Sequence, residues 1–376
     1  MSVDKGLAMT DWTMTRRSAL TAMAATLAVP AAAAGKRSVM LIVGTYAREG
    51  GKGLYPVAYD PERDAWRVGT PVAGIDDASF GVGGGPAGAY YLVREKALGE
   101  IAAYAPGWTR TGTIPTDGAD PCYVALDRPS GCLAVANYSS GSIAFYRLDP
   151  QTGALGRPVS FRHAGTGPNR ARQEGPHAHW VGFSPDRRWL HSVDLGTDTI
   201  FAYRFDPAAR TLAEPVPAWR APGGAGPRHL VHHPRRPRAY VVCELSNTLV
   251  TLDVGEEGRF TTRSTVSTLP AGYKGASQAA HIAIDRTGRR LYVSNRGHNS
   301  IAVFALDAAG VPTLLQHIDS GGDWPRMFLL LDESGRIVVA NEKSGSLAIF
   351  RIARDGTLSP TGQSLAVPGA VFLGAV

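Results

Sequence analysis

Short runs of hydrophobic and polar residues alternate along most of the chain, and the same order of runs returns several times. Each copy has an apolar strand, a polar turn, a second strand, a short loop and a third strand. Clear copies begin at Pro121, Ala178, Pro227, Ala280 and Pro325. Their period of about 40 to 57 residues suits a four-stranded propeller blade, whereas the 3.6-residue period of a helical solenoid is missing.

A weaker copy around "YYLVREKALGEIAAY" supplies a further blade. The N-terminal strand "SVMLIVGTY" and the C-terminal strand "AVFLGAV" can form another blade together, because closing the ring removes exposed sheet edges. The sequence therefore predicts an all-β fold, a seven-bladed β-propeller closed by strands from both chain ends. Six or eight blades are the alternatives.

The first 34 residues differ in character from the repeats. They combine Thr15-Arg16-Arg17, an apolar stretch from Ala19 to Val29 and a run of small residues ending near Ala34. This pattern predicts a cleavable, twin-arginine-like export signal peptide at 1–34 and a single propeller domain at 35–376. Ala19 stands where the twin-arginine pattern usually has a bulky apolar residue, so the general secretion route stays open. The apolar stretch is too short to span a bilayer, so we expect a periplasmic or secreted protein with no stable membrane anchor after cleavage.

Charge and cysteine content narrow the partners and the compartment. The formal charge is +7, and no Lys/Arg run with interleaved aromatics occurs, so a nucleic-acid partner is not expected. The three cysteines cannot all pair internally, and a hairpin over "DRPSG" sets Cys132 opposite Asp127, which leaves Cys122 out of disulfide reach. Free thiols fit a protein that folds in a reducing cytoplasm and is exported already folded.

Aligning the copies places chemically active residues in three columns. The column at the end of each second strand holds Asn137, Asp194, Cys243, Asn295 and Asn341, with Glu95 from the weaker copy. The residues that follow this column are Tyr138, Leu195, Glu244, Arg296 and Glu342. On the first strands, the third column holds Cys122, His179, Arg228, Ala280 and Arg326. Because these strands are antiparallel neighbours, all three columns lie at one rim of the ring.

Six charged or ionisable side chains of these columns should gather around the mouth of the central channel: His179, Arg228, Glu244, Arg296, Arg326 and Glu342. Such a concentration indicates a ligand site. Salt bridges between blades are the structural alternative.

The stretch "QEGPHAHW" adds His177, which alternation sets on the same strand face as His179. A zinc site would need a third ligand, and no cluster with suitable spacing follows the pair. A buried structural histidine and a general base are the other interpretations. A covalent nucleophile is not expected, because no Gly-x-Ser-x-Gly elbow occurs and Cys122 and Cys243 lie in apolar strands. Zinc stays open from the residues alone, because a third ligand could come in three dimensions from His163, His229, His232, His233 or His281. The expectation is nevertheless no metal and no cofactor.

The motifs "VGTYA", "ADPCYVALD", "RQEGPHAH", "GAGPRHLV", "CELSNT", "YVSNRGHNSIAVF" and "VANEKSGSLAIF" closely resemble the propeller lactonase family. That family contains a bacterial 6-phosphogluconolactonase and is related to a fungal muconate-lactonising enzyme. The resemblance implies a seven-bladed propeller that hydrolyses a sugar lactone without a metal. It also implies a catalytic set of one His, two Arg and one Glu, which matches His177 or His179 in "GPHAH", Arg228 in "GPRH", Glu244 in "CEL" and Arg296 in "SNR".

On this basis water is expected to attack the lactone with His179 or Glu244 as general base, while Arg228 and Arg296 stabilise the oxyanion. The expected substrate-binding residues are Arg326, Asn137, Asn295, Asn341 and Glu342. The substrate is either 6-phospho-D-glucono-1,5-lactone or, because of the export signal, an unphosphorylated aldonolactone. A muconate cycloisomerase-like lyase and a non-catalytic periplasmic binding propeller are the alternatives, and the sequence fixes no oligomeric state.

Overall fold

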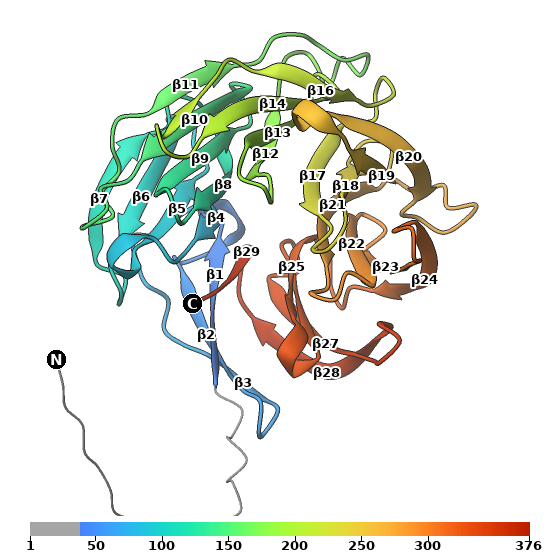
Figure 1. Cartoon of the computed structure of the whole chain (residues 1–376). Coiled ribbons are helices and arrows are strands. Elements are labelled where there is room, and N and C mark those ends of the chain that lie inside the picture. The colour runs from blue at the N-terminus through green and yellow to red at the C-terminus, as the bar shows by residue number, and fades with distance from the viewer. Residues whose placement is uncertain (1–37) are drawn as a thin grey trace, which may run out of the picture. The chain divides into compact units, whose positions relative to one another are not determined.

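The strands are arranged as the repeats predict. The computed structural model describes residues 38–376, and the predicted signal peptide at 1–34 lies outside them. Seven antiparallel sheets follow one another around a ring, each with its first strand toward the centre (Figure 1). The prediction of a seven-bladed β-propeller is confirmed. No helix in the described part of the chain is long and apolar enough to cross a membrane.

The closing blade joins the two ends of the chain. From the centre outward it contains β29 (Ala370–Ala375), β1 (Val39–Thr45), β2 (Tyr55–Asp60) and β3 (Ala65–Val68). Leu41 of β1 pairs with Ala375 of β29, and the C-terminus lies beside β1 in Figure 1. Ring closure by strands from both chain ends is therefore confirmed.

The next three blades follow in chain order. The second has β4 (Ala78–Val82), β5 (Tyr90–Arg94), β6 (Glu100–Tyr104) and β7 (Arg110–Pro115). The third has β8 (Pro121–Asp127), β9 (Cys132–Asn137), β10 (Ser142–Arg147) and β11 (Val159–Arg162). The fourth has β12 (Ala178–Phe183), β13 (Trp189–Asp194) and β14 (Thr199–Asp206), with β15 (Thr211–Leu212) and β16 (Val216–Arg220) both paired to β14.

The last three blades repeat the same order. The fifth has β17 (Pro227–His232), β18 (Arg238–Cys243), β19 (Thr248–Val254) and β20 (Phe260–Ser267). The sixth has β21 (Gln278–Ile284), β22 (Arg290–Arg296), β23 (Ser300–Leu306) and β24 (Pro312–Asp319). The seventh has β25 (Pro325–Leu331), β26 (Arg336–Asn341), β27 (Ser346–Ile352) and β28 (Leu358–Ala366). Four short 3-10 helices lie in loops, at Ala47–Glu49, Pro86–Gly88, Glu256–Gly258 and Asp332–Ser334.

The core lies between blades, so the middle strands are apolar on both faces. In β26, Ile337, Val338, Val339 and Ala340 are all buried, because each face of the sheet packs against a neighbouring blade. Ile143 of the third blade and Val181 of the fourth belong to one such cluster. Packing between successive blades thus holds the first strands in a ring around the channel.

Candidate active site

A β-bulge recurs at the same rim of the first strands and turns one side chain out of the ladder. In β12 the pairing jumps from Ala178–Asp194 to Trp180–Val193, which leaves His179 as the extra residue. The same irregularity isolates Ser79, Cys122, Arg228 and Arg326 in β4, β8, β17 and β25. Bulges are used to re-aim side chains in this way. The first-strand column of the sequence is therefore a column of bulge residues.

This register decides which histidine corresponds to Arg228. Ala178 pairs with Asp194 as Pro227 pairs with Cys243, so His179 is the counterpart of Arg228. The Gly-Pro shared by "GPHAH" and "GPRH" would equate His177 with Arg228. It is misleading, because the proline stands three residues before the bulge residue His179 but only one residue before the bulge residue Arg228.

The placement of Glu95 in the asparagine column was wrong. Arg94, not Glu95, ends β5 and pairs with both Ala78 and Glu100. The loop Glu95–Gly99 has one residue more than its counterpart Tyr138–Gly141. Counting five residues back from the start of the third strand therefore gave Glu95 instead of Arg94. Glu95 instead occupies the position of Glu244 and Glu342.

Glu244 lies at the centre of a cluster of three guanidinium groups. Its Oε2 accepts from Arg228 Nε at 3.0 Å and lies 2.7 Å from Arg296 Nη2. Its Oε1 accepts from Arg172 Nη2 at 2.5 Å. Glu244 is 1% exposed and Arg228 2% exposed, so both charges are almost fully removed from water. Arg228, Glu244 and Arg296 therefore meet as the columns predict.

The arginines determine the protonation state of this carboxylate. Burial by itself would raise the pKa of Glu244, but Arg296, Arg228 and Arg172 together hold the pKa well below its usual value. Burial and the neighbouring charge of Arg296 lower the pKa of Arg228 to about 9, so Arg228 still carries its charge at neutral pH. A carboxylate with both oxygens bound by guanidinium groups is a poor general base. It is well suited to fixing the directions of the arginines.

Arg172 is a member of this cluster that the repeats did not indicate. It lies in the long loop between β11 and β12, which belongs to no column, and so repeat alignment could not find it. The buried side chain of Gln173 anchors the loop by donating to Leu195 O at 2.8 Å. Arg172 Nη2 also donates to Tyr138 Oη at 3.3 Å, which links the loop to the third blade.

The two histidines of "GPHAH" have different surroundings. His177 stacks on Tyr138 with ring centroids 4.6 Å apart, and its Nδ1 donates to Tyr138 O at 3.2 Å. Its Nε2 lies 3.2 Å from Oε1 of the exposed Glu174. His179 lies deeper, with Nδ1 3.7 Å from Cys122 Sγ.

His179 is held as a neutral imidazole. Burial, and next the charge of Arg228, place the pKa of His179 well below 6.5. Burial also raises the pKa of the Cys122 thiol, whose S–H donates to Ala178 O or to His179 O, at 3.6 and 3.5 Å. The sulfur can then accept the Nδ1 proton of His179. This arrangement leaves Nε2 of His179 as the nitrogen with a free lone pair.

A second charged cluster surrounds Arg326. Its guanidinium lies 3.5 Å from Glu95 Oε2 and 3.8 Å from Glu342 Oε2. Tyr46 donates to Glu95 Oε2 at 2.5 Å, and Arg48 Nη2 lies 3.7 Å from Glu342 Oε1. Burial alone would lower the pKa of Arg326, but Tyr46, Glu95 and Glu342 raise it above the usual value. The formal charges of this cluster, two arginines and two glutamates, cancel.

The three asparagines predicted to bind substrate are not at the mouth surface. Asn137, Asn295 and Asn341 are each 0% exposed. Their Nδ2 groups donate to the backbone carbonyls of Thr116, Thr268 and Ser320, at 3.1, 2.8 and 3.1 Å. Each bond ties the end of a second strand to the chain that leaves a fourth strand. The three side chains thus join neighbouring blades, and the expectation that they bind sugar hydroxyls stays a prediction.

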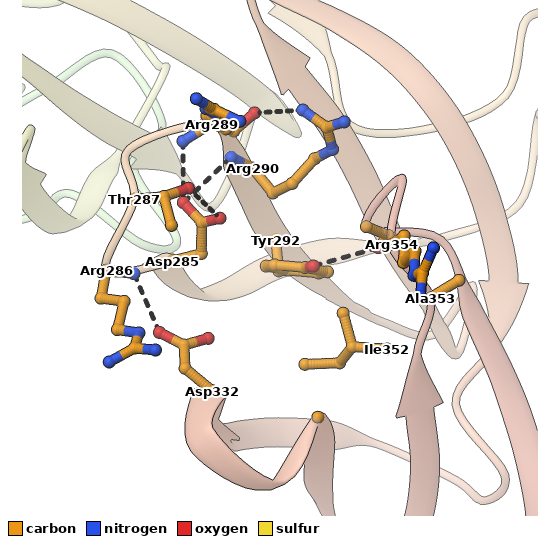
Figure 2. Close-up of a pocket in the computed structure, with 12 residues that line it drawn as sticks. Asp285, Arg286, Thr287, Arg289, Arg290, Tyr292, Asp332, Ile352, Ala353 and Arg354 are labelled. Atoms are coloured by element: carbon orange, nitrogen blue, oxygen red, sulfur yellow. Dashed lines mark hydrogen bonds between the residues drawn. The ribbon is translucent and has the colours of Figure 1, made fainter.

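Other clefts lie away from these clusters. A cleft of about 320 Å³ lies beside the β21–β22 turn. Its lining includes Asp285, Arg289, Arg290 and Tyr292 (Figure 2). This turn is at the opposite end of β21 and β22 from Gln278 and Arg296, and the carboxylate of Asp285 accepts from the backbone of Arg289 and Arg290. Within residues 38–376, no three His, Cys, Asp or Glu side chains gather as metal ligands.

Comparison with known proteins agrees with this architecture. Residues 40–374 match the family described as "Lactonase, 7-bladed beta-propeller". The 6-phosphogluconolactonase of Bacillus subtilis is 34% identical over 338 residues, which cover 87% of this chain and 95% of that protein. The structure of the Pseudomonas aeruginosa periplasmic gluconolactonase superposes with a TM-score of 0.82 at 28% identity, over 90% of this chain and 99% of that one.

A further solved structure, a putative 6-phosphogluconolactonase from Bacteroides fragilis, gives a TM-score of 0.83 at 26% identity and covers 92% of this chain and 99% of its own. The fold and these matches thus define the class of protein as a propeller of the lactonase type. The chain belongs to the seven-bladed β-propeller lactonase family.

Proposed function

We propose that this protein hydrolyses an aldonolactone at the mouth of the propeller channel. The observation that carries the proposal is the buried set of Arg228 and Arg296, both bound to Glu244, beside the neutral imidazole of His179. Fixed guanidinium groups suit the oxygen that becomes negative when a carbonyl is attacked. A neutral imidazole with a free Nε2 can take the proton of the attacking water.

The reaction follows from these positions. Water adds to the lactone carbonyl carbon while His179 Nε2 accepts one of its protons. Arg228 and Arg296 stabilise the oxyanion. The bond between the carbonyl carbon and the ring oxygen then breaks, and His179 returns the proton to that oxygen. One water is consumed. The carboxylic acid formed releases its proton to solvent, and the product leaves as a carboxylate facing the arginines. Glu244 keeps its charge throughout.

The charges favour an unphosphorylated substrate. The Glu244 cluster has three arginines against one glutamate and can receive one carboxylate. Arg326 is already balanced by Glu95 and Glu342, so it offers little excess charge to a phosphate. It is better placed to join these carboxylates in binding sugar hydroxyls. D-Glucono-1,5-lactone should therefore be turned over with a higher kcat/KM than its 6-phosphate.

A lactone panel tests this proposal by acid release, with a muconate assay alongside to detect a lyase. Glu244→Gln and Arg228→Met should each lower kcat/KM for gluconolactone by about 10²- to 10³-fold. Glu257→Gln is the control, because that exposed carboxylate pairs only with Arg259 on the surface. Wild-type rates in both site variants, with the folded state verified by circular dichroism, would refute the assignment.

The same lactonase would act outside the cytoplasm. The predicted leader at 1–34, with Arg16 and Arg17, supports export, and the Pseudomonas relative is itself a periplasmic gluconolactonase. Replacing both arginines with lysine should retain the protein in the cytoplasm if the twin-arginine route is used. Cell fractionation measures this outcome, and periplasmic protein in that variant would indicate general secretion instead.

A further inference from the structure

Beneath Arg228 lies a second pair of histidines that has no part in the reaction above. His229 follows Arg228 on β17, and His281 lies on the neighbouring first strand β21. Their Nδ1 atoms are 3.1 Å apart. Arg228 Nη1 lies 3.1 Å from His229 Nε2 and 3.5 Å from His229 Nδ1. The contacts form a continuous path from Glu244 through Arg228 to His281.

Both imidazoles are neutral at neutral pH. Burial lowers the pKa of His281 to about 3, and the charge of Arg228 contributes to this. Burial, and next the charge of Arg228, place the pKa of His229 well below 6.5. Each ring therefore carries one N–H, and one proton must lie between the two Nδ1 atoms.

The guanidinium decides which ring supplies that proton. Arg228 can only donate, so the His229 nitrogen that faces it most closely, Nε2, must be the bare one. His229 then carries its proton on Nδ1 and donates to Nδ1 of His281. His281 in turn carries its proton on Nε2, for which the described residues provide no acceptor. The opposite arrangement would point an N–H of His229 at the cation.

The ring planes are fixed as well. Tyr123 and His179 contact the His229 ring edge-to-face, with centroids 5.1 and 5.3 Å away. Phe328 contacts His281 in the same manner at 4.9 Å. These aromatic contacts hold the planes of both rings. Within those planes, the contacts of His229 with Arg228 and with His281 Nδ1 place the nitrogens.

Arg228 is thereby held on two of its three nitrogens. Nε donates to Glu244, and Nη1 donates to Ala280 O at 2.7 Å and to His229. Nη2 has no hydrogen-bond partner among residues 38–376. Because the guanidinium is planar, fixing Nε and Nη1 also fixes the direction of the Nη2 hydrogens.

We propose that His229 and His281 form a positioning pair for Arg228, with the tautomers Nδ1–H on His229 and Nε2–H on His281. The pair holds Arg228 so that Nη2 is directed at the lactone carbonyl oxygen. The catalytic part rests on the proposed lactonase function, whereas the tautomers stand independently of it.

Nitrogen-15 NMR of the full chain labelled on histidine reads the tautomers directly. At pH 7 we expect an unprotonated Nε2 on His229 and an unprotonated Nδ1 on His281, with signals assigned by loss in His229→Phe and His281→Phe. An Nε2–H tautomer of His229, or a charged imidazole on either residue, would overturn the proposal whether or not the protein is a lactonase.

Kinetics tests the positioning role with two variants of one residue. The Oε1 of His229→Gln can accept from Arg228 as Nε2 does, whereas His229→Phe fills the space without an acceptor. We expect kcat for gluconolactone to fall by about tenfold in His229→Phe, with a smaller change in KM and partial recovery in His229→Gln. Equal losses in the two variants at equal thermal stability would overturn positioning by this nitrogen. Failure of the wild type to hydrolyse any lactone would instead refute the proposed function.

Discussion

Among single residues, Glu244 shows most clearly how surroundings change chemistry. A carboxylate among candidate catalytic residues can act as a general base, and the sequence predicted either Glu244 or His179 for this role. Its contacts with Arg172, Arg228 and Arg296 lower its affinity for a proton instead. The proposed mechanism therefore uses His179 as the proton acceptor and assigns to Glu244 the task of holding the arginines.

The pH dependence of the rate distinguishes the histidines. Because the pKa of His179 is well below 6.5, it stays neutral as the pH falls, and kcat/KM should remain level from pH 8 to below pH 6. A base with an ordinary imidazole pKa would lose activity already near pH 6.5. Initial rates in a pH-stat, corrected for spontaneous lactone hydrolysis, measure the profile.

Paired variants complete this test. His179→Gln should abolish turnover, whereas His177→Gln should retain a measurable rate, because His177 is engaged by Tyr138 and Glu174. The reverse ranking would assign the base to His177, and a fall in the wild-type rate centred near pH 6.5 would contradict a base of lowered pKa at His179.

At the scale of elements, an asparagine recurs near the ends of β9, β22 and β26 and joins neighbouring blades by a buried hydrogen bond. Asn341→Ala removes the donor to Ser320 O inside the protein, and leaving a buried carbonyl unpaired costs about 1 to 3 kcal/mol. The free energy of unfolding in urea should fall by that amount, with kcat/KM of the folded protein unchanged. Asn137→Ala and Asn295→Ala remove the same contact in other blades and should lose a similar amount.

An opposite result would restore the binding role expected from the sequence. If Asn341→Ala kept its stability and lost kcat/KM at least tenfold, the amide would have to reach substrate.

The β-bulges are the other structural feature that recurs at the scale of elements. They place His179, Arg228 and Arg326 at one rim although each belongs to a different blade.

At the scale of the whole molecule, buried neutral histidines make stability depend on pH. Burial lowers the pKa of His191 to about 4 and of His232 and His281 to about 3, and holds those of His179 and His229 well below 6.5. The unfolded chain binds protons at these residues below pH 6.5 while the folded chain does not. The stabilising contribution is therefore complete above pH 6.5 and is lost as the pH falls from there.

Each such residue contributes about 1.4 kcal/mol per pH unit in that range. Urea unfolding between pH 7 and 5 should show a steep loss of stability, equivalent to the uptake of several protons. His281→Phe should reduce the slope by one proton, because the variant removes one of the titrating groups. A stability that is flat over this interval would contradict the neutral state of the buried histidines.

The sequence alone determined the blade architecture. Each blade has its own alternation of apolar and polar residues and its own turn residues, and the repeat of this pattern along the chain is visible when the copies are aligned. The sequence also determined that Arg228, Glu244 and Arg296 share a rim, because antiparallel neighbours fix the ends of strands. The sequence alignment placed Glu95 one position away from its true place in the repeat. The loop after β5 has one extra residue, which shifts the alignment without changing the order of apolar and polar residues.

Only the tertiary structure decided the rest. Arg172 reaches Glu244 from 72 residues away along the chain through an irregular loop, which carries no periodic signal. The asparagines are buried because the neighbouring connection covers them, and burial cannot be read from a residue's place in a repeat. The protonation of Glu244, His179 and His229 follows from summed charges and lost hydration in three dimensions, and these exist only once the blades have closed the ring.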